Sequence, residues 1–289
     1  MKQKRVRPAA GVLSALVLLA GFTWYENRTI QTQTFRLRAP NLPQAFSAMR
    51  VVQISDLHGE IFGENSARLL AAVQDATPDL IAVTGDLADE YTDFSMLRPL
   101  VSGLCAIAPV CYVTGNHEWV LSREKRQQLF EILDECGVIR LRNEFRLLQK
   151  NGETMVLAGV DDPNGPSDQK TPAQLVSEIR QSCGEAAYIL MLSHRNDQLE
   201  LWAQLGVDAV LCGHAHGGVV RLPIAGGVFG TRYDLFPDYT AGIYTQGKTQ
   251  VLVSRGLGRS HRVPLRIFNR PQLVVAILER LTIRSQPPK

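Results

Sequence analysis

Side chains that can bind metal ions occur in five short groups of this sequence, and each group directly follows an apolar run. The groups are Asp56-Leu57-His58, Gly85-Asp86-Leu87-Ala88-Asp89, Gly115-Asn116-His117-Glu118, Ser193-His194 and Gly213-His214-Ala215-His216. Asp86 follows Asp56 by 30 residues, and Asn116 follows Asp86 by another 30, which suits one βαβ step in each interval. Because ligands in open α/β sheets collect at the carboxyl ends of the strands, we expect these groups to lie together.

Histidine is concentrated in these groups. The chain has six histidines, of which five belong to the groups and one, His261, does not. A single histidine beside a strand is more often a structural residue than a ligand, but five that converge with aspartates are typical of a metal site. Mixed imidazole and carboxylate ligands without thiolates suit Mn²⁺, Fe or Zn²⁺. The supply of ligands is sufficient for two ions.

The elements that must position these groups are visible as apolar runs that alternate with helical patterns. We expect strands at 34–38, 50–54, 80–84, 110–114, 154–160, 189–192, 209–212, 249–254 and 273–278. We expect helices at 66–76, 93–104, 123–136, 172–182 and 197–205, and a long loop or hairpin region at 217–247. This alternation predicts an α/β fold of βαβ units, with two sheets packed face to face and helices outside them.

In type and order the five groups resemble the motifs of the calcineurin-like metallophosphoesterase superfamily over roughly residues 50–280. Segments 217–223 and 253–258 are similar to the YkuE/YaeI-type branch of bacterial membrane-associated phosphodiesterases. That branch often has Gln where this chain has Val219, and Asn-Pro where it has Arg195-Asn196. The resemblance implies the four-layer sandwich of that superfamily, in which two mixed β-sheets pack face to face and are flanked by helices.

The resemblance also implies seven ligands for two divalent metal ions. Asp56, His58 and His216 would bind one ion, Asn116, His194 and His214 would bind the other, and Asp86 would bridge them. Two cations about 3.5–4 Å apart can hold both the attacking and the leaving oxygen of a phosphoryl group, with a bridging hydroxide as the nucleophile. The neutral amide oxygen of Asn116 supplies a ligand without further lowering the positive charge of the site.

His117 follows one of these ligands and has a separate role in the superfamily. It would face the phosphate and either stabilise the transition-state charge or protonate the leaving group. Asp89 or Glu118 could orient a histidine ligand. The alternative for Asp89 is a solvated acid in a turn, and the alternative for Glu118 is a carboxylate at a helix N-terminus, where the helix dipole favours it. We predict His117 and Asp89 as the catalytic residues.

Other polar positions could contact the substrate. Asp161-Asp162-Pro163 ends a predicted strand and either lines the substrate pocket or forms an Asx turn before the proline. Arg221 and Arg255 are candidate contacts of the phosphate, with an ordinary surface salt bridge as the alternative. These positions would decide how the phosphate and its substituents are held.

The N-terminus has the features of a targeting segment. Four basic residues precede an uncharged run at 8–25, which as a helix would span ~27 Å, close to the ~30 Å of a bilayer core. Trp24 and Tyr25 end this run, at the position of an interfacial aromatic belt. We therefore expect a transmembrane signal anchor within residues 1–28, with a cleaved signal peptide as the alternative. Because a basic flank stays in the cytoplasm, the catalytic domain of this cell-membrane protein would be extracytoplasmic.

The length and the net charge of the chain limit which domains and which partners are expected. After the anchor we expect a linker and edge strand at 29–49 and one catalytic domain at 50–289, because 289 residues approach the upper limit for one hydrophobic core. The net charge is +3; residues 1–28 carry +4, so the body carries −1. A nearly neutral body argues against a nucleic-acid partner, and hence against a nuclease.

The five cysteines form no CxxC motif, and their odd number excludes complete pairing within the chain.

Together these observations predict a metal-dependent phosphoester hydrolase, and the branch resemblance favours a phosphodiesterase. The anchor favours a membrane- or envelope-associated phosphoester substrate, such as a lipid-linked one. An enzymatic alternative is a pyrophosphatase of the UDP-2,3-diacylglucosamine type, although such a substrate lies on the cytoplasmic face. The alternative outside enzymes is a metal-binding scaffold without turnover, which would be expected to lack a ligand or His117, and neither is lacking.

Overall fold

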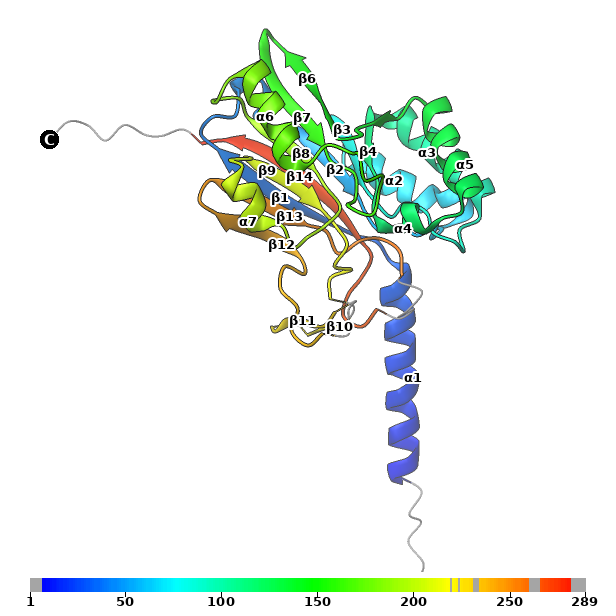
Figure 1. The fold of residues 1–289 in the computed structure, drawn as a ribbon. Coiled ribbons are helices and arrows are strands. Elements are labelled where there is room, and N and C mark those ends of the chain that lie inside the picture. Colours follow the sequence, from blue (N-terminus) through cyan, green and yellow to red (C-terminus); the bar gives the residue numbers. More distant parts are fainter. Residues whose placement is uncertain (1–6, 219, 223, 231–233, 260–265, 282–289) are drawn as a thin grey trace, which may run out of the picture.

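Two six-stranded sheets pack face to face and form the body of the protein (Figure 1). The computed structural model describes residues 7–218, 220–222, 224–230, 234–259 and 266–281. Two residues singled out in the sequence, Val219 and His261, lie outside the described residues. The strands of the first sheet are, in order, β1 (Gln31–Ala39), β14 (Gln272–Arg280), β2 (Arg50–Ile54), β3 (Leu80–Thr84), β4 (Val110–Val113) and β5 (Ile139–Arg140).

The second sheet repeats this plan with its own edge strands. Its order is β12 (Gly242–Gln246), β13 (Thr249–Val253), β9 (Ala209–Cys212), β8 (Ile189–Leu192), β7 (Glu153–Gly159) and β6 (Glu144–Lys150). Both sheets are mixed, because β14 runs antiparallel to β2 in the first, and β12 and β6 run antiparallel to their neighbours in the second. A small hairpin of β10 (Val220–Leu222) and β11 (Gly226–Phe229) stands beside them.

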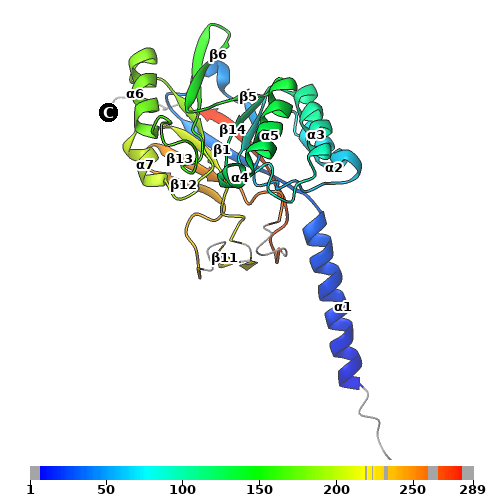
Figure 2. The same cartoon turned by 45° about the vertical axis from the view of Figure 1, so that its right-hand side comes forward.

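Helices cover the outer faces of the two sheets, as Figures 1 and 2 show. Helices α2 (Ala67–Asp75), α3 (Phe94–Ile107) and α5 (Arg123–Glu135) pack on the first sheet, and α6 (Pro172–Cys183) and α7 (Leu199–Gln204) pack on the second. The short α4 (Asn116–Val120) follows β4. The four-layer α/β sandwich predicted from the sequence is therefore present.

Three apolar layers hold these elements together. Strand β2 shows the principle, since Val51 lies between the two sheets and its neighbour Val52 lies under the helices of the first sheet. Both side chains are completely buried, because side chains alternate between the two faces of a strand and both faces are covered. On the second sheet, the fully buried Trp202 of α7 packs against β9 and β13.

Most predicted elements are confirmed, but two strands were missed. Strands β2, β3, β8 and β9 have the predicted bounds. The missed strands are β5 and β6, of which β6 forms a hairpin with β7. Asn151 and Gly152 connect them, both with positive φ, as type I′ turns require. The Asn-Gly pair between two apolar runs was the signal for this hairpin. Within 217–247, predicted as loop or hairpin, β12 joins the second sheet.

The N-terminal helix predicted from the sequence is present as α1 (Arg7–Arg28) and stands away from the body in both views (Figures 1 and 2). No helix among the residues that the structure describes is long and apolar enough to cross a membrane. Small and polar residues interrupt the apolar run of α1, namely Gly11, Ser14, Gly21 and Thr23.

Candidate metal centre

All seven predicted ligands lie at one edge of the sandwich, just beyond the carboxyl ends of five strands. Asp56 and His58 follow β2, Asp86 follows β3, Asn116 follows β4, His194 follows β8, and His214 and His216 follow β9. Three of these strands belong to the first sheet and two to the second. The two sheets therefore contribute side chains to the same place, as the positions of the groups in the sequence predicted.

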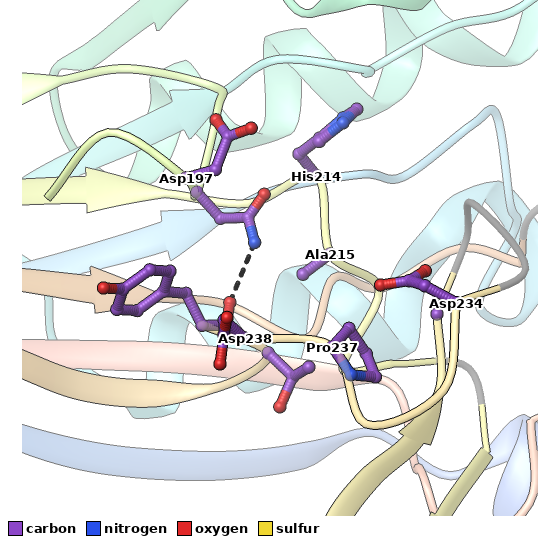
Figure 3. A pocket seen from close by; sticks show the side chains of 10 residues that line it. Asp197, His214, Ala215, Asp234, Pro237 and Asp238 are labelled. Atoms are coloured by element: carbon purple, nitrogen blue, oxygen red, sulfur yellow. Dashed lines mark hydrogen bonds between the residues drawn. The ribbon is translucent and has the colours of Figure 1, made fainter.

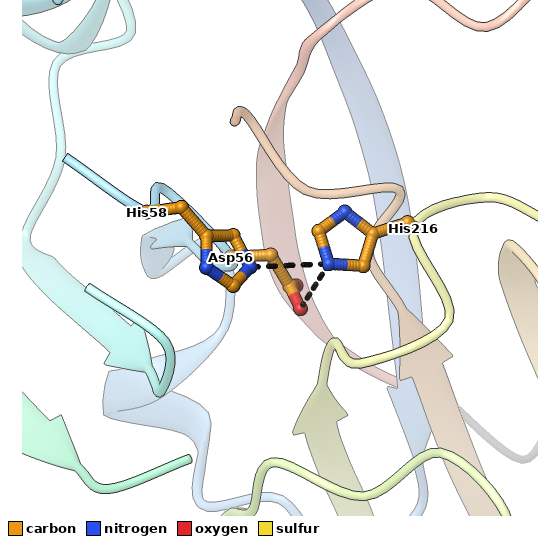
Figure 4. A group of neighbouring side chains, drawn as sticks. All are labelled: Asp56, His58 and His216. Carbon is orange, nitrogen blue, oxygen red and sulfur yellow. Dashed lines mark hydrogen bonds and ion pairs between the residues drawn. The ribbon is translucent and has the colours of Figure 1, made fainter. Parts of the chain in front are cut away.

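A first group consists of Asp56, His58 and His216, which point toward one another in Figure 4. The Nε2 atoms of the two histidines are 3.2 Å apart, and His216 Nε2 lies 3.5 Å from Asp56 Oδ1. Two nitrogens that each lie about 2.1 Å from one tetrahedral ion are separated by about 3.3–3.4 Å. The spacing of the imidazoles therefore fits ligands of a common cation.

A second group is centred on His194. Its Nε2 lies 3.1 Å from Asp86 Oδ2, 3.2 Å from Asn116 Oδ1 and 3.2 Å from His214 Nδ1. His194 and Asp86 are almost completely buried. The separations again equal those of ligands that share one ion, so this group has the donor set for a second cation.

Asp86 links the two groups. Its Oδ2 lies 3.1 Å from His194 Nε2 in the second group and 3.8 Å from His58 Nε2 in the first. Its other oxygen, Oδ1, accepts a hydrogen bond of 2.8 Å from the backbone N–H of His117. One oxygen is thus fixed by the backbone, and the other faces both groups, as a bridging ligand requires.

Five of the seven predicted ligands have a left-handed backbone conformation. Their φ angles are 50° at Asp56, 49° at His58, 52° at Asp86, 68° at His214 and 47° at His216. For residues other than glycine this conformation is unfavourable by about 1–3 kcal/mol each, and it persists where the surrounding structure imposes it. The turns that follow β2, β3 and β9 therefore contain strain at the residues that point into the site.

The glycines in the motifs provide room for the ligands. A Cβ atom at Gly115 would lie 2.2 Å from Asp86 Oδ1, and one at Gly213 would lie 2.2 Å from Asp56 Oδ2. Neither distance is possible for non-bonded atoms, so any side chain at these positions would displace a carboxylate of the site. This explains why glycine precedes Asn116 and His214.

Two histidines of the site are oriented by acceptors on their far side. His58 Nδ1 lies 3.3 Å from Asp89 Oδ2, and His194 Nδ1 lies 2.9 Å from the carbonyl oxygen of Thr84. An acceptor at Nδ1 holds the proton there and leaves Nε2 free to bind a metal. Asp89 is 1% exposed, so it is not a solvated turn acid, and its position matches the orienting role that the sequence suggested.

His117 lies beside the first group. Its ring meets the ring of His58 edge to face, with 4.7 Å between the centroids. It also lies close enough to His58 and Asp89 for the three to form a further potential metal-binding group. Burial lowers the pKa of His117 below its usual value, although the side chain keeps partial contact with solvent. His117 is therefore positioned at the accessible side of the site, as a residue that contacts a substrate must be.

Glu118 is a carboxylate in the first turn of α4, the alternative considered in the sequence, and it also binds the turn after β3. It is completely buried, and its carboxylate accepts hydrogen bonds from the backbone N–H groups of Asp86, Leu87 and Gly115, at 3.0, 2.7 and 2.7 Å. No contact with a histidine ring is present among its described hydrogen bonds. Glu118 thus ties the turn after β3 to the turn after β4. Burial and the charge of Asp86 raise its pKa to about 7.

The buried carboxylates require positive charge. Asp56, Asp86 and Asp89 are each at most 1% exposed, and a buried carboxylate is unfavourable unless a cation or a proton balances it. Burial lowers the pKa of His194, but the adjacent Asp86 outweighs this and raises it to about 10. In the absence of metal, His194 therefore holds a proton beside Asp86. Divalent cations would supply the same balancing charge, so the residues fit the two ions that the motifs imply.

Two cavities adjoin the second group. One of about 240 Å³ lies beside His214 and is lined by Asn196, Tyr239 and three aspartates (Figure 3). The other, of about 250 Å³, is lined by His194, Arg195 and the 161–171 segment. These are the spaces at the site that could receive the substituents of a substrate.

The arginines predicted as phosphate contacts are engaged elsewhere. Arg221 donates to the carbonyl oxygen of Gly217 and to Thr240, and Arg255 donates to Gln31 of β1. Sequence reasoning missed Arg195, which lies between His214 and Asp162. The position of Arg195 directly after His194 was the one sequence signal that it lies at the site.

Adjacent groups that could each hold a metal ion, on the strand ends of a four-layer sandwich, fit a site for two metal ions. Residues 49–218 match the family described as "Calcineurin-like phosphoesterase", and the chain belongs to this family. It is 27% identical to the uncharacterized metallophosphoesterase YkuE of Bacillus subtilis, over 93% of this chain and 94% of that protein. It is 28% identical to phosphodiesterase YaeI of Escherichia coli, over 78% of this chain and 80% of that protein.

We expect Glu118→Gln to destabilise the protein by about 1–3 kcal/mol, because the amide would place N–H donors against backbone N–H groups that now have an acceptor. The same change should weaken Mn²⁺ binding, since the turn that carries Asp86 loses its anchor. Urea unfolding with and without Mn²⁺ measures both effects. Glu185→Gln is the control and should change neither property, because the side chain of Glu185 is 90% exposed.

Metal binding should release at least one proton per protein at pH 8, because the raised pKa of His194 keeps this ligand protonated until an ion displaces the proton. Calorimetric titration with Mn²⁺ in two buffers of different ionisation enthalpy measures the release. His194→Gln should release fewer protons than the wild type. Identical apparent enthalpies in both buffers would contradict the charge state derived above.

Proposed function

We propose that the protein is a metal-dependent phosphodiesterase with a dinuclear centre. The observation that carries this proposal is the position of Asp86, whose Oδ2 faces both groups of potential ligands at once. Two ions held by a shared carboxylate suit the displacement at a phosphoryl group, where the attacking and the leaving oxygen both need a cation. The relative YaeI, named a phosphodiesterase, supports the choice of a diester.

In this proposal Asp56, His58 and His216 would hold the first ion, and Asn116, His194 and His214 would hold the second. Asp86 would be shared between them. When bound, the two ions acidify water and neutralise charge on the phosphoryl oxygens. Imidazole, carboxylate and amide donors without thiolates accept Mn²⁺, Fe or Zn²⁺.

His117 is proposed to act on the leaving group. Its side chain lies at the accessible side of the site, edge-on to His58. The protonated imidazole donates a proton to the departing alkoxide oxygen, and its backbone N–H meanwhile holds Oδ1 of Asp86 in place. Asp89 does not contact the substrate in this proposal, because it acts through His58 as a positioning residue.

The membrane anchor, the extracytoplasmic location and a membrane- or envelope-associated substrate stay predictions that depend on residues 1–28. The proposed substrate class is thus a phosphodiester whose substituents occupy the two cavities beside the second group.

The full-length protein, stripped of metal and reloaded with Mn²⁺, Fe²⁺ or Zn²⁺, should hydrolyse bis-p-nitrophenyl phosphate faster than p-nitrophenyl phosphate. His117→Ala should lower kcat by about 10²–10⁴-fold for a diester with an alkoxide leaving group, the usual contribution of a proton-transferring group, and by less for the nitrophenyl esters, because nitrophenolate departs without a proton. Release of p-nitrophenolate measures both rates, and metal analysis supplies the control, because His117→Ala should retain two ions.

No turnover with any of these metals, in a folded protein that binds two ions, would favour the non-catalytic scaffold. Faster hydrolysis of the monoester would replace the diesterase with a monoesterase. Loss of both ions in His117→Ala would instead show that this residue is a metal ligand and not the proton donor.

A further inference from the structure

Arg195 connects a buried carboxylate to the second group of metal ligands. Its Nε and one Nη atom contact the two oxygens of Asp162, at 2.5 and 3.0 Å. The side chain of Asp162 is completely buried, whereas that of Arg195 is 18% exposed. A planar guanidinium held at two points by a carboxylate has a fixed orientation. Asp162 therefore fixes where Arg195 points.

The remaining Nη atom of Arg195 points toward the proposed centre, 3.0 Å from Nε2 of His214. Arg195 also follows His194 in the chain, and both residues line the cavity of about 250 Å³. The guanidinium thus lies beside two of the proposed ligands of the second ion and at the wall of a space that a substrate could enter.

A count of donors shows that Arg195 has unused hydrogen-bonding capacity. A guanidinium has five N–H donors, and the contacts with Asp162 and His214 use three of them. The two others have no acceptor among the described residues. Such donors, on a cation that is mostly buried, favour a ligand with anionic oxygens.

The contact with His214 becomes unfavourable when an ion binds. If Nδ1 of His214 binds the ion, the proton of the neutral ring is on Nε2, which is then a donor facing another donor. His58 and His194 differ, because their far sides face a carboxylate and a carbonyl oxygen. Ion binding at the second group therefore makes a third N–H of Arg195 available and favours its movement to another acceptor.

We propose that Arg195 binds a non-bridging phosphoryl oxygen of the substrate, and that it exchanges its contact with His214 for this oxygen when the second ion is present. The inference rests on the proposed function and deepens it, since it names the residue that recognises the transferred phosphoryl group. Asp162 is a positioning residue in this arrangement. The guanidinium suits the task because its fork matches two oxygens of a phosphate.

The exchange has two consequences of opposite sign. Loss of the guanidinium removes a charged hydrogen bond to the phosphoryl group, so Arg195→Gln should bind inorganic phosphate, the probe, about ten- to a hundredfold more weakly. The same variant lacks the cation that opposes an ion at His214, so it should bind the second Mn²⁺ at least as tightly as the wild type. A purely structural role would weaken both.

Calorimetry of the full-length protein measures both affinities, first with Mn²⁺ added to the metal-free protein and then with phosphate added to the loaded protein. Arg195→Lys keeps the charge but not the fork, and should bind phosphate with intermediate affinity. Asp162→Asn should weaken phosphate binding while the ions are retained. The matched control is Arg140→Gln, because Arg140 pairs with Asp134 through two bonds of 2.7 Å, is 17% exposed and lines neither cavity.

Unchanged phosphate affinity in Arg195→Gln, with two ions bound, would overturn the inference and leave the proposed function intact. If Arg195→Gln and Arg195→Lys both lose ions and phosphate and both have a lower Tm, the inference is also overturned. Arg195 would then be a residue that stabilises the fold. Failure of the proposed function is distinguishable, because the wild type would then bind two ions without hydrolysing either nitrophenyl ester.

Discussion

The site is organised by the need to balance negative charge that the fold buries. Asp56, Asp86 and Asp89 lie at the sheet edge with almost no exposure, and carboxylates without compensation are not stable there. In the metal-free protein the balance comes from imidazoles, above all from His194, whose pKa is raised to about 10. The proposed divalent ions would balance the same carboxylates with a larger positive charge than the imidazoles carry. The close approach of imidazoles at 3.2 Å in both groups has the same explanation, since a shared cation turns facing nitrogens into co-ligands.

The backbone around these charges is shaped to keep them in place. Left-handed residues redirect the chain at the ends of β2, β3 and β9, and glycines make room for carboxylates at the points of closest approach. Glu118 adds a buried acceptor that joins the turn carrying Asp86 to the turn carrying Asn116. These features hold the ligand side chains in place before any ion binds. Ion binding therefore loses less conformational entropy.

The sequence predicted most of the sheets and the proposed ligands because both depend on local patterns. Strands such as β3 and β9 are continuous apolar runs, and the ligands follow them at once. The hairpin of β6 and β7 had a local signal in Asn151 and Gly152 that was not used. The role of Arg195 had no such signal, because its partner Asp162 lies 33 residues away in the chain and is brought near only by the fold. Helix α1 was predictable because it is a long run without charged side chains between Arg7 and Glu26.

The arrangement of the site also links it to the packing of the whole body. Each group of proposed ligands draws on both sheets, since His216 joins Asp56 and His58 in one, and His194 and His214 join Asp86 and Asn116 in the other. Without metal, hydrogen bonds already join the sheets near the site: the buried Gln53 donates to the carbonyl oxygen of Cys212, and the backbone N–H of His214 donates to Asp56. An ion in either group would tie the sheets together directly. Because such an ion binds only when both sheets are in register, its binding free energy adds to the free energy of unfolding.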